Sequence, residues 1–172
     1  FNEWTGTIGN KSKIYTPFKQ ITYLVSTFLL LLSINCYADS FNMSMLANWD
    51  EDSLDIQSNI IYNEIWGYVD CEGREYAIMG SLGYVHFFDI TNPSLPVEID
   101  AIPGTSNTRW RDIKTFRDRA YSVEEESDEG IVIYVLSDLP NSVSVTLRTT
   151  EFFTSAHNIF IDEAYGRHYA IG

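Results

Sequence analysis

Short apolar stretches, rich in β-branched and aromatic residues, alternate with groups of turn-forming residues along most of the chain after residue 60. Runs of this kind, bounded by Gly, Pro, Asn, Asp or Ser, are typical of β-strands. No stretch after residue 38 shows sustained 3.6-residue apolar periodicity with helix caps. The pattern therefore predicts an all-β fold. The expected strands are Ile65–Val69, Glu75–Met79, Tyr84–Ile90, Val97–Ile102, Ile113–Phe116, Ala120–Glu124, Ile131–Leu136 and Val143–Arg148.

The predicted strands recur with a period of about 47 residues. Isoleucines stand at positions 65, 113 and 159, and tyrosines that open the second strand of each period stand at 76, 121 and 169. A β-propeller blade likewise contains four short strands in a repeat of about this length. We expect blades over about residues 60–103, 108–150 and 155–172, and therefore about two and a half blades. A β-sandwich is the alternative, although it does not require these landmarks to recur.

A closed propeller usually has about 4–8 blades, more than this sequence supplies. The chain also begins with Phe1 rather than a methionine, and Gly172 falls within a predicted strand. We therefore expect a fragment of a longer protein. The apolar residues of segment 41–49 are expected to form a ring-closing strand that completes the last blade.

Residues 1–38 read as an N-terminal leader. Lys11, Lys13 and Lys19 precede an apolar core over 21–34, and small residues allow cleavage after Ala38. These are the parts of a secretory signal peptide. The core is too short to span a bilayer comfortably, so a signal anchor is the weaker alternative, as is a lipid-modified cysteine. The leader predicts an extracellular or cell-surface location, with no transmembrane segment beyond it.

The net charge of the chain excludes some classes of binding partner. The formal net charge is -13, and Glu3 is the only acidic residue before Asp39. So acidic a surface repels phosphate backbones and argues against nucleic-acid binding. The three histidines share no metal-ligand spacing, and Cys71 is the only cysteine after the leader. Neither a zinc site nor an internal disulfide is therefore expected.

The mature part resembles the LVIVD-repeat proteins called choice-of-anchor B, a bacterial group of exported proteins. The resemblance rests on the runs YNEIWGYVDCEGREYAIMG, HFFDITNP, WRDIKTF, YVLSDLP and AHNIFIDE, in this order along residues 41–172. It implies a secreted or surface-held β-propeller. It implies no reaction, and the anchor segment for which the group is named is not found in this sequence.

The candidate functional residues open each repeat. Glu64, Asp112 and Asn158 each directly precede one of the recurring isoleucines, and Arg111 and His157 adjoin two of them. If these isoleucines begin the innermost strands, the polar side chains ring one mouth of the central channel. Oxygen ligands in such a ring suit calcium or a polar ligand. The alternative is that they bind backbone amides at the strand entries and fix the blades.

A run of acidic residues, 124–130, is the other notable feature. It lacks the ligand order of a calcium-binding loop, so a solvated hairpin tip is expected. No nucleophile elbow, phosphate-binding Gly-rich loop or dinucleotide fingerprint occurs, and no catalytic residue or cofactor is assigned. The sequence favours an exported, non-enzymatic propeller that binds a protein or glycan at the cell surface. The alternative is a secreted polysaccharide hydrolase or lyase that uses the acids at the channel mouth.

Overall fold

The computed structural model describes residues 43–172, and the chain divides into two units, 1–44 and 45–172. The predicted signal peptide and its cleavage site lie outside the described residues. The second unit is all-β, as expected: its described residues contain strands and no helix. The strands are β1 (Tyr62–Val69), β2 (Glu75–Ser81), β3 (Tyr84–Asp89), β4 (Val97–Pro103), β5 (Arg111–Phe116), β6 (Arg119–Glu124), β7 (Ile131–Val135), β8 (Ser144–Thr149), β9 (Asn158–Asp162) and β10 (Arg167–Ile171).

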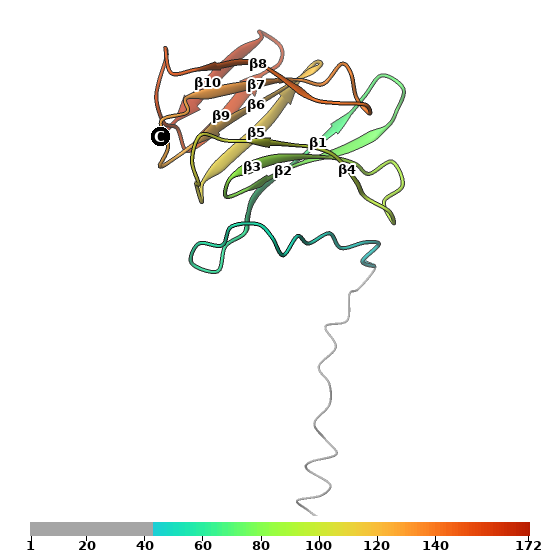
Figure 1. The fold of residues 1–172 in the computed structure, drawn as a ribbon. Helices are drawn as coiled ribbons and strands as arrows, with labels where there is room; N and C mark the ends of the chain where they lie inside the picture. Colours follow the sequence, from blue (N-terminus) through green and yellow to red (C-terminus); the bar gives the residue numbers. More distant parts are fainter. Residues whose placement is uncertain (1–42) are drawn as a thin grey trace, which may run out of the picture. The chain divides into compact units, whose positions relative to one another are not determined.

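These strands form three antiparallel sheets (Figure 1). The first sheet has the order β1-β2-β3-β4, the second has the order β5-β6-β7-β8, and the third contains β9 and β10. All eight strands expected between residues 65 and 148 are present, and no strand end is shifted by more than three residues. Each four-stranded sheet is a meander of neighbouring strands, because the short turns between the strands allow only antiparallel pairing.

The turn between β1 and β2 shows how the polar residues between two strands reverse the chain. Asp70 accepts hydrogen bonds through Oδ1 from the backbone N–H groups of Glu72, at 2.8 Å, and Arg74, at 3.0 Å. Gly73 adopts a φ of 79°, a conformation that costs a glycine little. Cys71 is exposed in this turn and forms no disulfide.

The main core lies between the first and second sheets. Alternate residues of β2 and β3 face alternate residues of β5, β6 and β7 across this interface, as the two-residue period of a strand requires. The rings of Phe87 and Tyr134 meet here with centroids 5.3 Å apart. Its buried members include Tyr76, Ile78, Val85, Phe87, Ile113, Ala120, Val132 and Tyr134.

A smaller core joins the second sheet to the third. It contains Val123 from β6 and Ala156 and Ile159 from the third-sheet side, with Tyr121 and Phe153 partly buried against them. β5 contacts both β1 and β9, so the first strands of the three sheets are neighbours. The polar residues at their N-terminal ends are thereby brought together.

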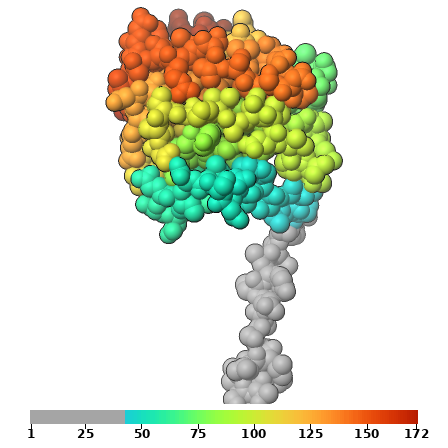
Figure 2. Space-filling view, in the orientation of Figure 1, coloured from blue at the N-terminus to red at the C-terminus, as the bar shows by residue number. Residues whose placement is uncertain are grey.

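Residues 45–60 cover the outer face of the first sheet, the face turned away from the second sheet. Trp49 packs there against the rings of Tyr62, His86 and Phe88, with centroids 5.8, 5.5 and 4.8 Å away. In Figure 2 the teal atoms of this segment lie against the green atoms of the first sheet. Residues 43–49, the described part of the segment expected to close a ring, form no strand with the described sheets, and the ring closure itself stays a prediction. Trp49 is held by contacts with the face of the sheet rather than by backbone pairing along its edge.

Candidate functional site

The residues that open the repeats do come together. Glu64 lies on β1, Asp112 on β5 and Asn158 on β9, on three neighbouring strands. Asn158 Nδ2 lies 3.5 Å from Asp112 Oδ2. Lys114 Nζ lies 3.9 Å from Glu64 Oε1 and also contacts Asp112 Oδ1. The ammonium group of Lys114 therefore stands between the two carboxylates, where the sequence had suggested a bound cation.

These carboxylates link one sheet to the next. Asp112 Oδ2 accepts a hydrogen bond of 2.7 Å from the backbone N–H of Ile159, the first buried residue of β9. Glu64 is joined to the second sheet through its contact with Lys114. Burial raises the pKa of Glu64, and the positive charge of Lys114 opposes the rise. For Asp112 this geometry is the one described by the packing alternative of the sequence-based interpretation, in which the side chain binds a backbone amide at a strand entry.

Glu64, Asp112 and Asn158 form a row across the first strands of the three sheets. Arg111 lies on the opposite face of β5 and takes no part in this first-strand row. Its guanidinium pairs with Glu124, and the two side chains are 0% and 1% exposed. Arg111 Nη1 also donates to the backbone carbonyl of Ser81 in the first sheet, at 2.8 Å. The side chain thus ties the second sheet to the first from inside the interface.

The acidic run 124–130 is the expected solvated hairpin tip only in part: Glu126 and Asp128 are exposed, but the acids at its two ends are buried. Glu124 is 1% exposed and Glu129 is 2% exposed. Glu124 pairs with Arg111, and Glu129 pairs with Arg148 from β8. Buried carboxylates require such partners, and these come from neighbouring strands that the local sequence does not reveal.

His157 is separate from the row as well. Its Nδ1 lies 2.5 Å from Glu125 Oε2, and its ring lies 5.7 Å from that of Trp110. The side chain is 46% exposed, so this pair is a surface contact. Of the five predicted site residues, three therefore lie together, and Arg111 and His157 lie elsewhere.

Across residues 43–172, no group of three or more His, Cys, Asp or Glu side chains is placed to hold a metal ion. The two carboxylates of the first-strand row have the Lys114 ammonium as their partner.

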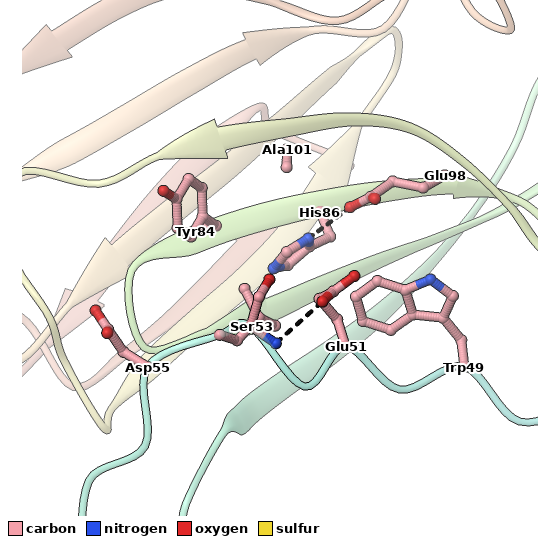
Figure 3. Close-up of a pocket in the computed structure, with 9 residues that line it drawn as sticks. Trp49, Glu51, Ser53, Asp55, Tyr84, His86, Glu98 and Ala101 are labelled. Carbon is pink, nitrogen blue, oxygen red and sulfur yellow. Dashed lines mark hydrogen bonds and ion pairs between the residues drawn. The ribbon is translucent and has the colours of Figure 1, made fainter.

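A pocket of about 310 Å³ lies where residues 45–60 cross the outer face of the first sheet (Figure 3). It is open to a ligand of modest size, since small-molecule sites begin at roughly 300 Å³. Aromatic rings and carboxylates from separate segments surround it. The lining residues are Trp49, Glu51, Ser53, Leu54, Asp55, Tyr84, His86, Glu98 and Ala101.

His86 is fixed at the base of this pocket through both ring nitrogens. Its Nδ1 lies 2.7 Å from Glu98 Oε1, and its Nε2 lies 2.9 Å from Ser81 Oγ. An ionised carboxylate only accepts, so Nδ1 carries a proton, and in the neutral ring Nε2 accepts from the Ser81 hydroxyl. The side chain of His86 is 3% exposed, and Ser81 is 1% exposed. This array positions the imidazole, while the Ser81 hydroxyl is out of reach of a ligand in the pocket.

A β-bulge brings Glu98 to His86. Phe87 pairs with Asp100, but the next residue, Phe88, pairs with Glu98, so β4 contains one extra residue at this point. His86 and Phe88 share a face because strand side chains alternate, and pairing with Phe88 places Glu98 on that face. Asp100 points to the other face, where it accepts a hydrogen bond from the backbone N–H of Val143, the residue before β8.

The remaining carboxylates of the pocket have uncharged partners. Glu51 Oε1 accepts from the backbone N–H of Ser53 at 3.0 Å, and Asp55 Oδ2 accepts from Asn107 Nδ2 at 2.9 Å. Hydrogen bonds from the Ser53 side chain and backbone lower the pKa of Glu51, which keeps it ionised at neutral pH. No lysine or arginine lines the pocket. Its chemistry therefore suits groups that donate hydrogen bonds and stack on aromatic rings.

Sequence reasoning missed this pocket. His86 is one of the three histidines that share no metal-ligand spacing, and Glu98 and Ser81 belong to no distinguishing motif. The alternation of β3 predicts that His86 and Phe88 share a face. The bulge that re-aims Glu98 and the path of residues 49–55 have no local sequence signal.

Comparisons with protein-family models, with curated proteins and with solved structures find no match to this chain. The part of the chain that the structure describes contains no helix of sufficient length and apolar character to cross a membrane.

Proposed function

We propose that this chain is an exported β-propeller module that binds a glycan at the cell surface and catalyses no reaction. The four-stranded sheets would be its blades, and the LVIVD-repeat proteins its relatives. Two features support a propeller: both complete sheets have the same strand order, and the first strands of successive sheets are neighbours. The leader over residues 1–38 supports export.

The pocket around His86 carries the proposal of ligand binding. Trp49 and Tyr84 present aromatic surface beside the carboxylates of Glu51, Asp55 and Glu98. Sugars offer flat apolar faces that stack on aromatic rings and hydroxyl groups that donate to carboxylates. A protein ligand remains the other member of the class expected from the sequence, but a pocket of about 310 Å³ fits one sugar ring better than a protein surface.

A binding role is favoured over catalysis because the first-strand acids already have structural partners. Asp112 is bonded to the Ile159 amide and contacts Lys114. The second candidate, a polysaccharide hydrolase or lyase, draws its support from the pocket instead, where the His86–Glu98 pair would supply a proton acceptor.

Calorimetric titration with a panel of soluble oligosaccharides tests the proposal. Glu51→Gln and Tyr84→Ala are expected to weaken the binding at least about tenfold, as loss of one hydrogen-bonding or stacking contact would. Glu72→Gln is the matched control, because Glu72 is an exposed acid paired with Arg74 in the β1–β2 turn. Binding that survives both pocket variants would contradict the assignment.

The same samples separate binding from catalysis. Release of new reducing ends or unsaturated products is measured for the wild type and for Glu98→Gln. The binding proposal expects no product from either protein. Turnover by the wild type that disappears in Glu98→Gln would contradict the binding proposal and favour the hydrolase or lyase.

A further inference from the structure

The acids that line the pocket around His86 differ from the buried acids of the run 124–130 in their partners. Glu124 and Glu129 each pair with an arginine from another strand. Among the lysine and arginine side chains of residues 43–172, none forms an ion pair with Glu51, Asp55 or Glu98. The pocket is therefore a place where several carboxylates face one cavity without a cationic side chain of the chain itself.

The hydrogen bond from His86 does not cancel the charge of Glu98. His86 Nδ1 donates to Glu98 Oε1 at 2.7 Å, while Nε2 of the neutral ring accepts from the Ser81 hydroxyl at 2.9 Å. Hydrogen bonds from Ser53 lower the pKa of Glu51, so this carboxylate is also ionised at neutral pH. The pocket thus gathers negative charge that no side chain around it balances.

The carboxylates lie beside aromatic rings (Figure 3). Glu51 and Glu98 lie on the side of the pocket where Trp49 is found. Asp55 lies on the opposite side, near Tyr84, whose side chain is 38% exposed. The face of an aromatic ring attracts a cation and also stacks on the apolar face of a sugar. Both kinds of contact are therefore available within the same pocket.

The pocket suits an organic cation better than a metal ion. No group of three or more acids, histidines or cysteines in residues 43–172 is placed to hold a metal together. The carboxylates are instead spread around a cavity of about 310 Å³. An ammonium group has three N–H donors that can reach separate oxygens, and hydrogen bonds between charged groups are the stronger ones. A ligand that carries an ammonium group on a larger body matches this arrangement.

We propose that the pocket binds an amino sugar whose amine is free and protonated, as one unit of a glycan. The inference rests on the proposed function and narrows it from glycans in general to cationic ones. The ammonium group donates to Glu51 and Glu98 beside Trp49, and the apolar face of the sugar ring stacks on Tyr84. A neutral sugar in the same place would leave these carboxylates without a counter-charge.

The charge of the whole chain favours the same class of ligand. The formal net charge is -13. A surface of this sign attracts a polycationic glycan over a distance and repels glycans that carry carboxylate or sulfate groups. Because salt screens such attraction, the binding should weaken as the ionic strength rises.

Calorimetric titration of the full chain with three tetrasaccharides tests the inference. Their sugar units are β-linked glucosamine, N-acetylglucosamine and glucose, which differ only in the amine, acetamide or hydroxyl group at carbon 2. The glucosamine form is expected to bind at least about tenfold more tightly than either neutral form, as a few ion-pair and cation–π contacts would give. The glucose form separates charge from size, because a hydroxyl group is no bulkier than an amine.

Glu51→Gln tests the assigned carboxylate, since it removes one charge and keeps the size of the side chain. The preference for the glucosamine form over the glucose form should fall at least about threefold in this variant. Glu163→Gln is the matched control, because it removes the same charge from an exposed acid in the turn between β9 and β10. This control should keep the preference of the wild type.

The outcomes separate this inference from the proposed function. Equal binding of the three tetrasaccharides would overturn the inference and leave glycan binding in place, whereas binding of none would overturn both. Cadaverine, a diamine without a sugar ring, is expected to bind at least about tenfold more weakly than the glucosamine form. Equal affinity for cadaverine would overturn the assignment to a sugar. An equal loss of preference in Glu163→Gln would assign the preference to overall charge and would also overturn the inference.

Discussion

The buried Arg111–Glu124 pair gives the strongest prediction for stability. The two side chains are 0% and 1% exposed, with Arg111 Nε 3.1 Å from Glu124 Oε1. Arg111→Met leaves the Glu124 carboxylate buried without its counter-charge and removes a donor from the Ser81 carbonyl. Breaking one side of a buried ion pair costs about 3–5 kcal/mol. We therefore expect Arg111→Met to lower the free energy of unfolding by that amount, a large part of the total for a domain of this size.

Urea unfolding followed by tryptophan fluorescence and far-UV circular dichroism measures the loss. The double variant Arg111→Met/Glu124→Leu removes both charges, so it should recover much of the stability that Arg111→Met loses. Arg119→Met is the control: Arg119 pairs with Asp118 at the surface, with side chains 33% and 51% exposed. That change should cost less than about 1 kcal/mol.

Two results would refute this reasoning. In the first, Arg111→Met costs no more than Arg119→Met, which would mean that the pair is solvated. In the second, the double variant loses as much stability as Arg111→Met and Glu124→Leu lose separately, added together, which would mean that the two charges do not compensate each other. Either result would return Arg111 to the set of candidate ligand-binding residues in which the sequence placed it.

Three further predictions concern pH and backbone conformation. Burial raises the pKa of Asp70, but hydrogen bonds from neighbouring backbone and side-chain donors lower it further, to about 2. The contribution of the ionised Asp70 to the free energy of unfolding is therefore full above about pH 4 and is lost as pH falls through about 2, so the stability of Asp70→Asn should differ from that of the wild type at pH 5 and converge with it near pH 2. Burial raises the pKa of Tyr134 to about 12, so the contribution of the neutral Tyr134 to stability is full below about pH 10 and is lost as pH rises through about 12. In a titration followed by absorbance at 295 nm, the tyrosine ionisation near pH 12 should be smaller in Tyr134→Phe than in the wild type, and a native protein whose tyrosines all ionise near pH 10 would contradict the burial. Gly130 has a φ of 70°, and a Cβ there would lie 2.1 Å from the Thr149 carbonyl oxygen, so Gly130→Ala should cost more than about 3 kcal/mol in urea unfolding, whereas Gly73→Ala, with open space around it, should cost about 1 kcal/mol.

Much of the local structure follows from the sequence. The β-branched and aromatic residues of Glu75–Met79 and Tyr84–Ile90, with turn residues between the two segments, are enough to predict β2 and β3. The regular spacing of Ile65, Ile113 and Ile159 likewise anticipates that Glu64, Asp112 and Asn158 lie on neighbouring strands. These predictions depend on interactions between residues close in sequence or on a repeated pattern, both of which are visible in the chain itself.

The partners of the polar side chains depend on tertiary structure. Glu124 and Glu129 read as solvated acids until Arg111 and Arg148 approach them from other strands. A carboxylate is buried only when a counter-charge is supplied, and that counter-charge is distant in sequence.

The pocket depends on tertiary structure in the same way. Glu98 reaches His86 because one extra residue in β4 shifts the register, and Trp49 closes the pocket by lying on the face of the first sheet. A one-residue shift reverses the face of every residue beyond it while leaving the local composition unchanged. For this reason the sequence alone determined the strands and their order along the chain, and only the packed sheets decided which side chains form the pocket.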